Sequence, residues 1–176
     1  MGLLRKILGR TRRTEDKPAS GKPGARAYAV GDIHGRLDLL EVLLDRIETD
    51  ISSREEKETV IIFLGDLIDR GPDSAGVVER LRTFRPDYAE TVFLAGNHEE
   101  LVLRILEGDT KPLRQWLRYG GGECVESYGV RTEDLLKLTR QEALELLRAR
   151  VPSSHLGFLR SMKDTFRFGE YVFVHA

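Results

Sequence analysis

The sequence predicts an α/β fold built around a parallel sheet that is covered on both faces. Strand-like and helix-like segments alternate through the first hundred residues, which favours parallel strands joined by helical crossovers. The strand-like runs are continuously apolar, as expected for strands buried on both faces. Polar motifs follow successive runs at spacings of 34 residues, from Asp32 to Asp66, and 31 residues, from Asp66 to Asn97. Each spacing fits one βαβ unit of about 30 residues or more.

Three strand–helix pairs form the expected sheet unit. Apolar runs predict strands at 27–30, 60–64 and 91–95, and apolar residues at helical spacing predict helices at 36–49, 74–84 and 99–106. Asp73 or Ser74 is the expected cap of the second helix. Because open α/β sheets place their ligands at the carboxyl ends of the strands, the polar motifs that follow these strands are expected to lie together there.

Residues 108–161 are expected to form a helical insertion packed beside that edge, with helices near 133–148 and 153–161. The glycine run at 120–122 is interpreted as a flexible turn, because it lacks the Lys and the Ser or Thr of a phosphate-binding P-loop.

A β-hairpin is expected after the insertion. Alternation at 165–168 predicts a half-exposed strand, Gly169 and Glu170 predict a turn, and the apolar run at 171–174 predicts a buried strand.

The first residues form a separate, basic segment. Residues 1–26 hold eight Lys or Arg and two Asp or Glu, a net charge of +6, whereas the whole chain carries −1. Proline and glycine interrupt this stretch, so we expect a disordered tail at 1–26 and one domain at 27–176. Nucleic-acid binding would depend on this tail alone and is not expected.

Composition excludes other classes of protein. No stretch is long and apolar enough to span a membrane, and the basic segment at 1–10 lacks the apolar centre of a secretory signal. Cys124 is the only cysteine, so an internal disulfide is impossible and a cytoplasmic location is expected.

The first polar motif is Gly31-Asp32-Ile33-His34-Gly35. Two residues apart in an extended segment, Asp32 and His34 would point to the same side and could hold one metal ion between a carboxylate and an imidazole. The alternative is that Asp32 only forms a turn and His34 lies on the surface.

The second motif, Gly65-Asp66-Leu67-Ile68-Asp69-Arg70-Gly71, follows the most apolar run. Asp66 is placed to bridge two metal ions. Asp69 can orient an imidazole by accepting its N–H, and Arg70 offers a planar fork for two phosphate oxygens. The alternative is a polar surface loop with an Asp–Arg pair.

The third motif is Gly96-Asn97-His98-Glu99. Asn97 could be a helix cap, with Glu100 completing a box-like arrangement, or it could give a neutral oxygen to a second metal. Capping gives no reason for His98, which could protonate a departing alkoxide.

Two further histidines lie outside these motifs. His175 ends an apolar run, where packing gives no reason for a titratable ring, so we expect it to bind the second metal. His155 lies at a helix start, away from the strand ends, and is expected to be structural or exposed.

Together these groups form the inventory of a binuclear site that hydrolyses phosphate esters. Without cations, Asp32 and Asp66 would crowd negative charge at neighbouring strand ends. Two cations about 3.5–4 Å apart would share a hydroxide that attacks phosphorus in line. Oxygen and imidazole ligands accept Mn²⁺, Fe or Zn²⁺, and Mn²⁺ is the expected ion.

These motifs resemble those of the calcineurin-like metallophosphoesterases, and within them the phosphoprotein phosphatases. The family pattern is Gly-Asp-x-His-Gly, Gly-Asp-x-x-Asp-Arg-Gly, Gly-Asn-His-Glu and His-Ala-Gly. The chain matches the first three in full and the fourth as His175-Ala176. Segments at 71–74 and 121–129 are similar to the bacterial serine/threonine protein phosphatase branch, and the resemblance covers about residues 27–176.

The resemblance implies a sandwich of two mixed β-sheets flanked by helices, with the metals at the sheet edge. It implies that Asp32, His34 and Asp66 bind one metal. It also implies that Asp66, Asn97 and His175 bind the other.

Three further roles come with the resemblance. Arg70 would hold the phosphate, and His98 with Asp69 would be the acid and its orienter. The family carries another metal-binding His and another phosphate-binding Arg beyond the fourth motif. We therefore expect this chain to be incomplete at its C-terminus, with part of the second sheet missing.

The expected function is that of a metal-dependent serine/threonine protein phosphatase acting on a phosphorylated protein or a small phosphoester. The nearest enzymatic alternative is a symmetrical diadenosine tetraphosphate hydrolase, a group that tends to have Asp where this chain has Glu99. An alternative of another class is an inactive module that binds phosphopeptides.

Overall fold

The computed structural model describes residues 19–176. Its main sheet has three parallel strands in the order β1-β2-β3: β1 (Ala25–Val30), β2 (Glu58–Phe63) and β3 (Glu90–Phe93). Two helices make the crossovers between them: α1 (Leu37–Ser52) and α2 (Ser74–Thr83). The predicted strand–helix alternation is confirmed, with boundaries that move by one to three residues.

The three strands end at one row of the sheet. Val30 pairs with Phe63, and Phe63 pairs with Phe93. The chain therefore leaves all three strands at the same edge, and the three polar motifs begin side by side. The expectation that parallel pairing brings these motifs together is confirmed.

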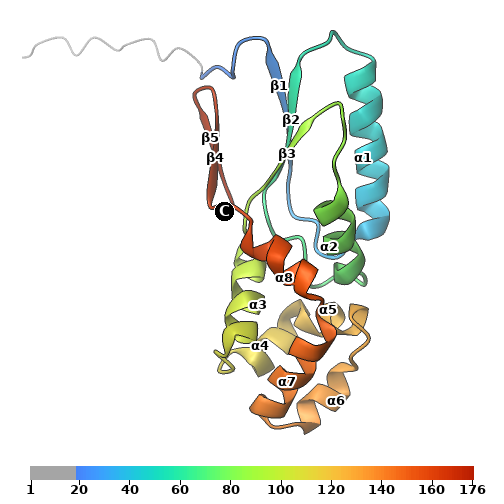
Figure 1. The fold of residues 1–176 in the computed structure, drawn as a ribbon, viewed down its shortest axis with the longest axis vertical. Helices are drawn as coiled ribbons and strands as arrows, with labels where there is room; N and C mark the ends of the chain where they lie inside the picture. The colour runs from blue at the N-terminus through green and yellow to red at the C-terminus, as the bar shows by residue number, and fades with distance from the viewer. Residues whose placement is uncertain (1–18) are drawn as a thin grey trace, which may run out of the picture.

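The sheet is covered on both faces (Figure 1). Ile61 and Phe63 of β2 pack into the core shared with the helices, whereas Val60 and Ile62 pack into a smaller core on the opposite face. All four side chains are at most 5% exposed. A strand buried in this way needs apolar residues at every position, which explains why the run lacks alternation.

Helices fill the segment between β3 and the hairpin and gather beyond the carboxyl edge of the sheet (Figure 1). They are α3 (Asn97–Glu107), α4 (Leu113–Trp116), α5 (Gly122–Ser127), α6 (Thr132–Lys137), α7 (Arg140–Arg150) and α8 (Ser153–Arg160), and a kinked segment (Leu117–Gly121) joins α4 to α5.

The single helix predicted at 133–148 is wrong, because two helices, α6 and α7, occupy this stretch. Leu138 and Thr139 have extended backbones. The Thr139 side chain accepts a hydrogen bond from the Glu142 N–H, and the Glu142 carboxylate accepts one from the Thr139 N–H. This capping box starts a new helix where apolar periodicity alone suggested continuation.

The hairpin has antiparallel strands β4 (Thr165–Phe168) and β5 (Tyr171–Val174) and lies across the sheet face opposite α1 (Figure 1). The prediction that 171–174 is buried is wrong: Val172 is 61% exposed and Val174 is 48% exposed. Phe173, by contrast, packs against the sheet. The hairpin packs only one of its faces against the core, so alternate residues of β5 are exposed. A uniformly apolar run does not show which residues these are. Among the described strands, this sheet is antiparallel and the other is parallel, rather than each being mixed.

The N-terminal boundary also differs from the prediction. Ser20 donates its backbone N–H to Glu170 at 2.7 Å, and the Tyr171 hydroxyl donates to the Ala19 carbonyl at 2.8 Å. Residues 19 and 20 thus contact the hairpin and 25–26 belong to β1, so a disordered tail that reaches residue 26 is wrong for these residues. The rest of the predicted tail, residues 1–18, lies outside the described residues. Within 19–176, no helix has the length and apolarity needed to cross a membrane.

Candidate metal centre

Backbone hydrogen bonds join the first two polar loops into one unit. The N–H groups of Ile33 and His34 both donate to the Asp66 carbonyl, at 3.0 and 2.9 Å. The Gly35 N–H donates to the Leu67 carbonyl at 2.8 Å. The first loop therefore takes its position from the second, and Asp66 is fixed by its backbone as well as by its side chain.

Left-handed backbone conformations are concentrated in these loops. Within 19–176, the non-glycine residues with positive φ are His34 at 45°, Asp66 at 50°, Asp69 at 71° and Arg70 at 65°. Each is one of the predicted site residues. Such conformations cost on the order of 1–3 kcal/mol each, and they cluster at functional sites. The extended geometry assumed for Asp32 and His34 is wrong, because a turn at His34 brings the pair together.

Glu99 organises the second loop from the first turn of α3. Its carboxylate is fully buried and accepts four backbone N–H groups, which belong to Asp66, Leu67, Ile68 and Gly96 at 2.8, 2.9, 3.3 and 2.9 Å. Burial raises the pKa of Glu99, and the Gly96 N–H opposes that rise. The sequence alone did not predict this structural role for Glu99. A fully buried acid one turn into a helix could not be recognised without the fold.

The cap of α3 differs from the expectation. Gly96 is the residue before the helix, and Asn97 is its first residue rather than its cap. Glu99, not Glu100, makes the return bond to the cap backbone. Gly96 also lies so close to Asp66 that a side chain at 96 would collide with the Asp66 carboxylate. The third loop thus leaves the Asn97 side chain free of capping.

The first group of candidate ligands surrounds His34. Its Nδ1 lies 2.8 Å from the Ile68 carbonyl, which can only accept, so Nδ1 carries the proton and Nε2 faces the site with a lone pair. His34 Nε2 lies 3.7 Å from an oxygen of Asp32 and 3.7 Å from Asp66 Oδ2. One imidazole nitrogen and two carboxylates therefore converge.

The second group surrounds His175. Its Nδ1 lies 2.9 Å from the Leu64 carbonyl, which again leaves the Nε2 lone pair facing inward. That nitrogen lies 3.0 Å from Asn97 Oδ1 and 3.5 Å from Asp66 Oδ1. Three acceptor atoms thus face one another with no proton among them, an arrangement that a divalent cation satisfies.

Asp66 belongs to both groups through different oxygens. Oδ2 faces His34 and Oδ1 faces His175. The side chain is 6% exposed, and its Oδ1 also lies 3.2 Å from the His98 N–H. The donor set therefore fits two divalent ions that share one buried carboxylate.

Distances between candidate ligand atoms do not by themselves separate the expected metal ligands from His98. One set of mutually close ligand atoms joins His34, Asp66 and His98, and another joins Asp32, Asp66 and His175, each within 4.8 Å. His98 therefore lies close enough to be a ligand, and its hydrogen bonds indicate which role it has.

His98 is held through its other nitrogen. Nδ1 lies 2.6 Å from Asp69 Oδ2, and Asp69 is fully buried. The indole N–H of Trp116 donates to the same Asp69 oxygen at 2.7 Å. Trp116 lies within the segment predicted as a helical insertion, and no sequence pattern predicts this contact because the two residues are 47 positions apart.

Arg70 closes the site on its exposed side. Its Nη1 donates to His34 Nε2 at 2.7 Å, and its Nη2 donates to His98 Nε2 at 3.2 Å. The guanidinium therefore lies within hydrogen-bond distance of both imidazoles. All eight predicted site residues are brought into one connected cluster by these contacts.

His155 lies away from this cluster. It is buried, with Nε2 3.0 Å from Glu79 and Nδ1 3.0 Å from the Tyr128 hydroxyl. These contacts join α8 to α2 and to the end of α5, which is the structural alternative expected for this residue.

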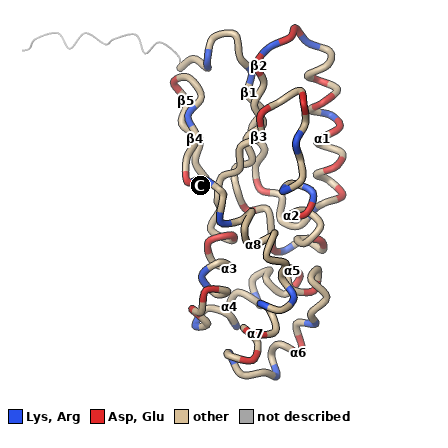
Figure 2. Tube along the Cα trace, viewed as in Figure 1, with Lys and Arg blue, Asp and Glu red and all other residues tan. Residues whose placement is uncertain are grey.

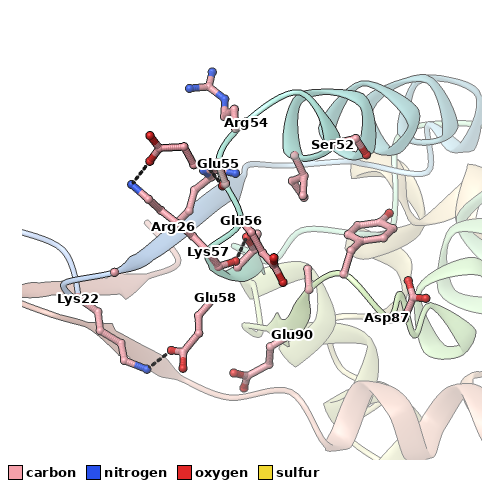
Figure 3. A pocket seen from close by; sticks show the side chains of 15 residues that line it. Lys22, Arg26, Ser52, Arg54, Glu55, Glu56, Lys57, Glu58, Asp87 and Glu90 are labelled. Atoms are coloured by element: carbon pink, nitrogen blue, oxygen red, sulfur yellow. Dashed lines mark hydrogen bonds and ion pairs between the residues drawn. The ribbon is translucent and has the colours of Figure 1, made fainter.

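A wide pocket at the opposite end of the sheet has a different character (Figure 3). It is lined by residues around the amino ends of the strands, where Lys22 pairs with Glu58 and Arg26 donates to the Glu55 carbonyl. It contains none of the predicted site residues. The chemistry therefore resides at the carboxyl edge.

A parallel sheet carrying carboxylate, amide and imidazole groups at its carboxyl edge defines a metal-binding α/β domain. The family model for calcineurin-like phosphoesterases matches residues 25–167. This chain belongs to the calcineurin-like phosphoesterase family.

Curated relatives of this chain include protein phosphatases and tetraphosphatases. Serine/threonine-protein phosphatase 2 of Escherichia coli K12 is 34% identical over 120 residues, which are 68% of this chain and 46% of the relative. The symmetrical bis(5'-nucleosyl)-tetraphosphatase of Dechloromonas aromatica is 33% identical over 84 residues, 48% of this chain and 28% of the relative. The chain spans less than half the length of each.

A solved structure supports the fold. A crystal structure described as a candidate diadenosine tetraphosphatase superposes with a TM-score of 0.50 and 23% identity, covering 85% of this chain and 49% of the other. The predicted fold class, a calcineurin-like α/β arrangement, is confirmed.

Proposed function

We propose that this chain carries the catalytic centre of a metal-dependent serine/threonine protein phosphatase that hydrolyses phosphomonoesters. The observation that carries the proposal is the Asp66 carboxylate, whose two oxygens face two different imidazoles. One divalent ion would be held by Asp32, His34 and Asp66. The other would be held by Asp66, Asn97 and His175, and Mn²⁺ is the ion proposed for both positions. The bound ions would supply Lewis acidity toward the phosphoryl oxygens and toward a nucleophilic water.

Arg70 would bind the substrate phosphate. Its guanidinium is exposed and lies within hydrogen-bond distance of the two imidazoles. Two N–H groups in a fixed planar fork match two phosphoryl oxygens. Arg70 would then orient the ester and stabilise the negative charge that develops on its oxygens.

His98 would act as the acid. Its Nε2 faces the site, and its Nδ1–H is held by the buried Asp69 carboxylate. Asp69 would stabilise the protonated ring and fix its orientation, so that Nε2, once it carries a proton in place of its contact with Arg70, can deliver that proton to the departing serine or threonine oxygen. Chemistry of this type needs no covalent phosphoenzyme, and the single cysteine, Cys124, is buried away from solvent.

A second function is favoured by the tetraphosphatase relatives. Symmetrical tetraphosphatases match 46–85% of this chain at 29–37% identity. Glu99 is the sequence feature that favours the protein phosphatase, since that alternative group tends to carry Asp there. Turnover of a phosphoserine peptide and of diadenosine tetraphosphate, measured side by side, distinguishes the two.

The partner would be a phosphorylated protein or a small phosphoester in the cytoplasm. Nucleic acid is a poor candidate for the described surface: α1 carries five acidic residues and one basic residue, and Figure 2 shows the acidic positions along its length. An acidic helix of this kind repels a phosphate backbone.

The experiment is Mn²⁺-dependent phosphate release from a phosphoserine peptide by this chain. Asp66→Asn is the test variant, and Asp45→Asn, an exposed position on α1, is the matched control. Release that requires Mn²⁺, survives in Asp45→Asn and is abolished in Asp66→Asn supports the proposal. Metal-dependent binding of the peptide by the folded chain without release would instead support the phosphopeptide-binding alternative.

A further inference from the structure

We propose that Trp116 is a positioning residue for the candidate acid, and that the glycine run at 120–122 is shaped to hold both Trp116 and the loop of Asp69 and Arg70. The proposal rests on the proposed roles of Asp69 and His98. It gives the helical segment a direct part in setting the geometry of the site.

The contact concentrates on a single oxygen atom. Asp69 Oδ2 accepts the Trp116 indole N–H at 2.7 Å and the His98 Nδ1–H at 2.6 Å. Asp69 Oδ1 is buried and is the one such side-chain atom without a hydrogen-bond partner in the described part of the chain. The orientation of this carboxylate therefore depends on two donors, and one of them comes from α4.

Asp69 and Trp116 are both shielded from solvent, since Asp69 is fully buried and Trp116 is 3% exposed. Burial, followed by the negative charge of Asp69, raises the pKa of the neighbouring Cys124 thiol well above its ordinary value, so this thiol stays neutral. Loss of the indole donor would leave the carboxylate free to rotate about its remaining bond to His98.

The glycine run explains how the helical segment approaches so closely. A side chain at Gly121 would collide with the indole ring of Trp116. Gly120 has a φ of 110°, and its carbonyl accepts the Arg70 N–H at 2.8 Å. A Cβ at Gly120 would lie 2.7 Å from Arg70 Cγ. The run at 120–122, interpreted as a flexible turn, instead forms the kink before α5 and the first residue of that helix, and it packs closely against Arg70 and Trp116.

The same segment thus contacts consecutive residues of one loop. Trp116 binds the side chain of Asp69, and Gly120 binds the backbone of Arg70. A kink with non-helical backbone at Tyr119 and Gly120 joins the two contacts. A purely structural Trp would need burial but would not need to donate to this carboxylate.

The first test reads the contact directly. Trp116 is the only tryptophan, so the ¹H–¹⁵N spectrum of the full chain contains one indole signal. A hydrogen bond to a carboxylate moves that proton downfield, so Asp69→Asn should return it upfield. Asp134→Asn, at an exposed position on α6, is the matched control and should leave the signal in place. An indole signal that Asp69→Asn does not move overturns the proposal.

The second test separates the N–H from the packing of the ring. Replacing Trp116 by 3-benzothienylalanine keeps the ring shape and removes the donor, and Trp116→Phe is the encoded counterpart. Loss of one hydrogen bond to a charged group should lower kcat about tenfold with KM unchanged. Leu113→Ala, a core change on the same helix, should lower thermal stability without this change in kcat.

A double variant distinguishes an effect of Trp116 through Asp69 from a general effect on packing. If Trp116 acts through Asp69, removing the indole donor in the Asp69→Asn background should cause no further loss of kcat. An equal loss in both backgrounds would show an effect through packing and would overturn the proposal.

A spectroscopic measurement keeps this proposal separate from the proposed function. The His98 Nδ1 proton, identified by its loss in His98→Asn, should shift when the indole donor is removed. A chain that shows this shift but releases no phosphate contradicts the phosphatase proposal and retains Trp116 as a positioning residue. If the chemical shift of the His98 Nδ1 proton does not change when Trp116 is replaced by 3-benzothienylalanine, the positioning role is contradicted, whatever the activity of the chain.

Discussion

Asp66 combines an unusual backbone conformation, a buried charge and contacts to both candidate metal positions. Its backbone is left-handed with a φ of 50°, its side chain is 6% exposed, and its oxygens face two imidazoles. Strain and burial of charge both disfavour this arrangement. Glu99 offsets part of the cost by binding the N–H groups of residues 66–68. The proposed role of Asp66 would therefore depend on Glu99, a neighbour outside the candidate ligand set.

Replacing His98 by Asn should reduce turnover without removing metal. A general acid typically contributes about 10²–10⁴-fold, so kcat for phosphoserine peptide should fall within that range. Metal content, measured by elemental analysis of the dialysed protein, should match that of the unmodified chain. Loss of metal in His98→Asn would instead identify His98 as a ligand.

Replacing Glu99 by Gln should destabilise the fold. The amide offers one acceptor oxygen and places an NH₂ group against backbone donors, so about 2–4 kcal/mol of unfolding free energy should be lost. Urea unfolding measures the difference. Glu100→Gln, the exposed neighbour on the same helix, is the control and should change stability by about 0.5 kcal/mol or less. Similar stability for both variants would show that the buried carboxylate does not support the loop.

At the scale of elements, side chains that join helices to strands hold the layers in place. The Tyr28 hydroxyl of β1 donates to Asp50 of α1 at 2.6 Å, and Arg54 donates to the same carboxylate at 2.7 and 2.9 Å. On the other side of α2, His155 links α8 to Glu79. These contacts fix the helices whose amino ends follow the polar loops.

Asp50 should make stability depend on pH. Hydrogen bonds from Arg54 and then Tyr28 lower the pKa of Asp50 from its ordinary 3.8 to about 2. A lowered folded-state pKa stabilises the fold above about pH 4, and this contribution is lost as pH falls toward 2. The melting temperature of Asp50→Asn should therefore lie below that of the unmodified chain at pH 6, and the gap should narrow between pH 4 and pH 2.

The control for this measurement is Asp45→Asn, at an exposed position on the same helix. It removes the same charge from α1 without touching Tyr28. A pH-dependent gap of equal size in both variants would contradict the role given to the Asp50 contacts.

At the scale of the molecule, the sheet is one layer between two unequal covers. Helices α1 and α2 cover one face, and the hairpin covers the other, where Val172 and Val174 remain exposed (Figure 1). The strand ends, the polar loops and α3 meet at one edge. Negative charge is concentrated there, so binding of cations should stabilise the whole chain.

Divalent metal should raise the melting temperature. An ion at about 100 times its Kd contributes about 2.7 kcal/mol, which corresponds to about 5–10 °C for a chain of this size. Differential scanning calorimetry with and without Mn²⁺ measures the shift. Asp66→Asn should lose most of it and Asp45→Asn should retain it. A shift that survives in Asp66→Asn would show that the metal binds elsewhere.

The order of the elements and the chemistry of the motifs were readable in the sequence. Apolar runs and their spacing determine a parallel sheet, and parallel pairing forces the three motifs to one edge because all strands end in the same direction. The sequence was less informative where one pattern of apolar residues is compatible with two local conformations. The run at 171–174 suits a half-exposed edge strand as well as a buried one, and Thr139 interrupts a helix that apolar periodicity continues.

Only the tertiary structure decided how the motifs are held. The four donors that surround Glu99 come from two loops, and the indole that binds Asp69 comes from a helix 47 residues away. No spacing rule encodes such contacts, because the distance along the chain between the partners is unrelated to their distance in space. The sequence by itself determined which groups could bind metal and phosphate. The packing of α3 and of the 116–122 segment against one strained loop decided where those groups point.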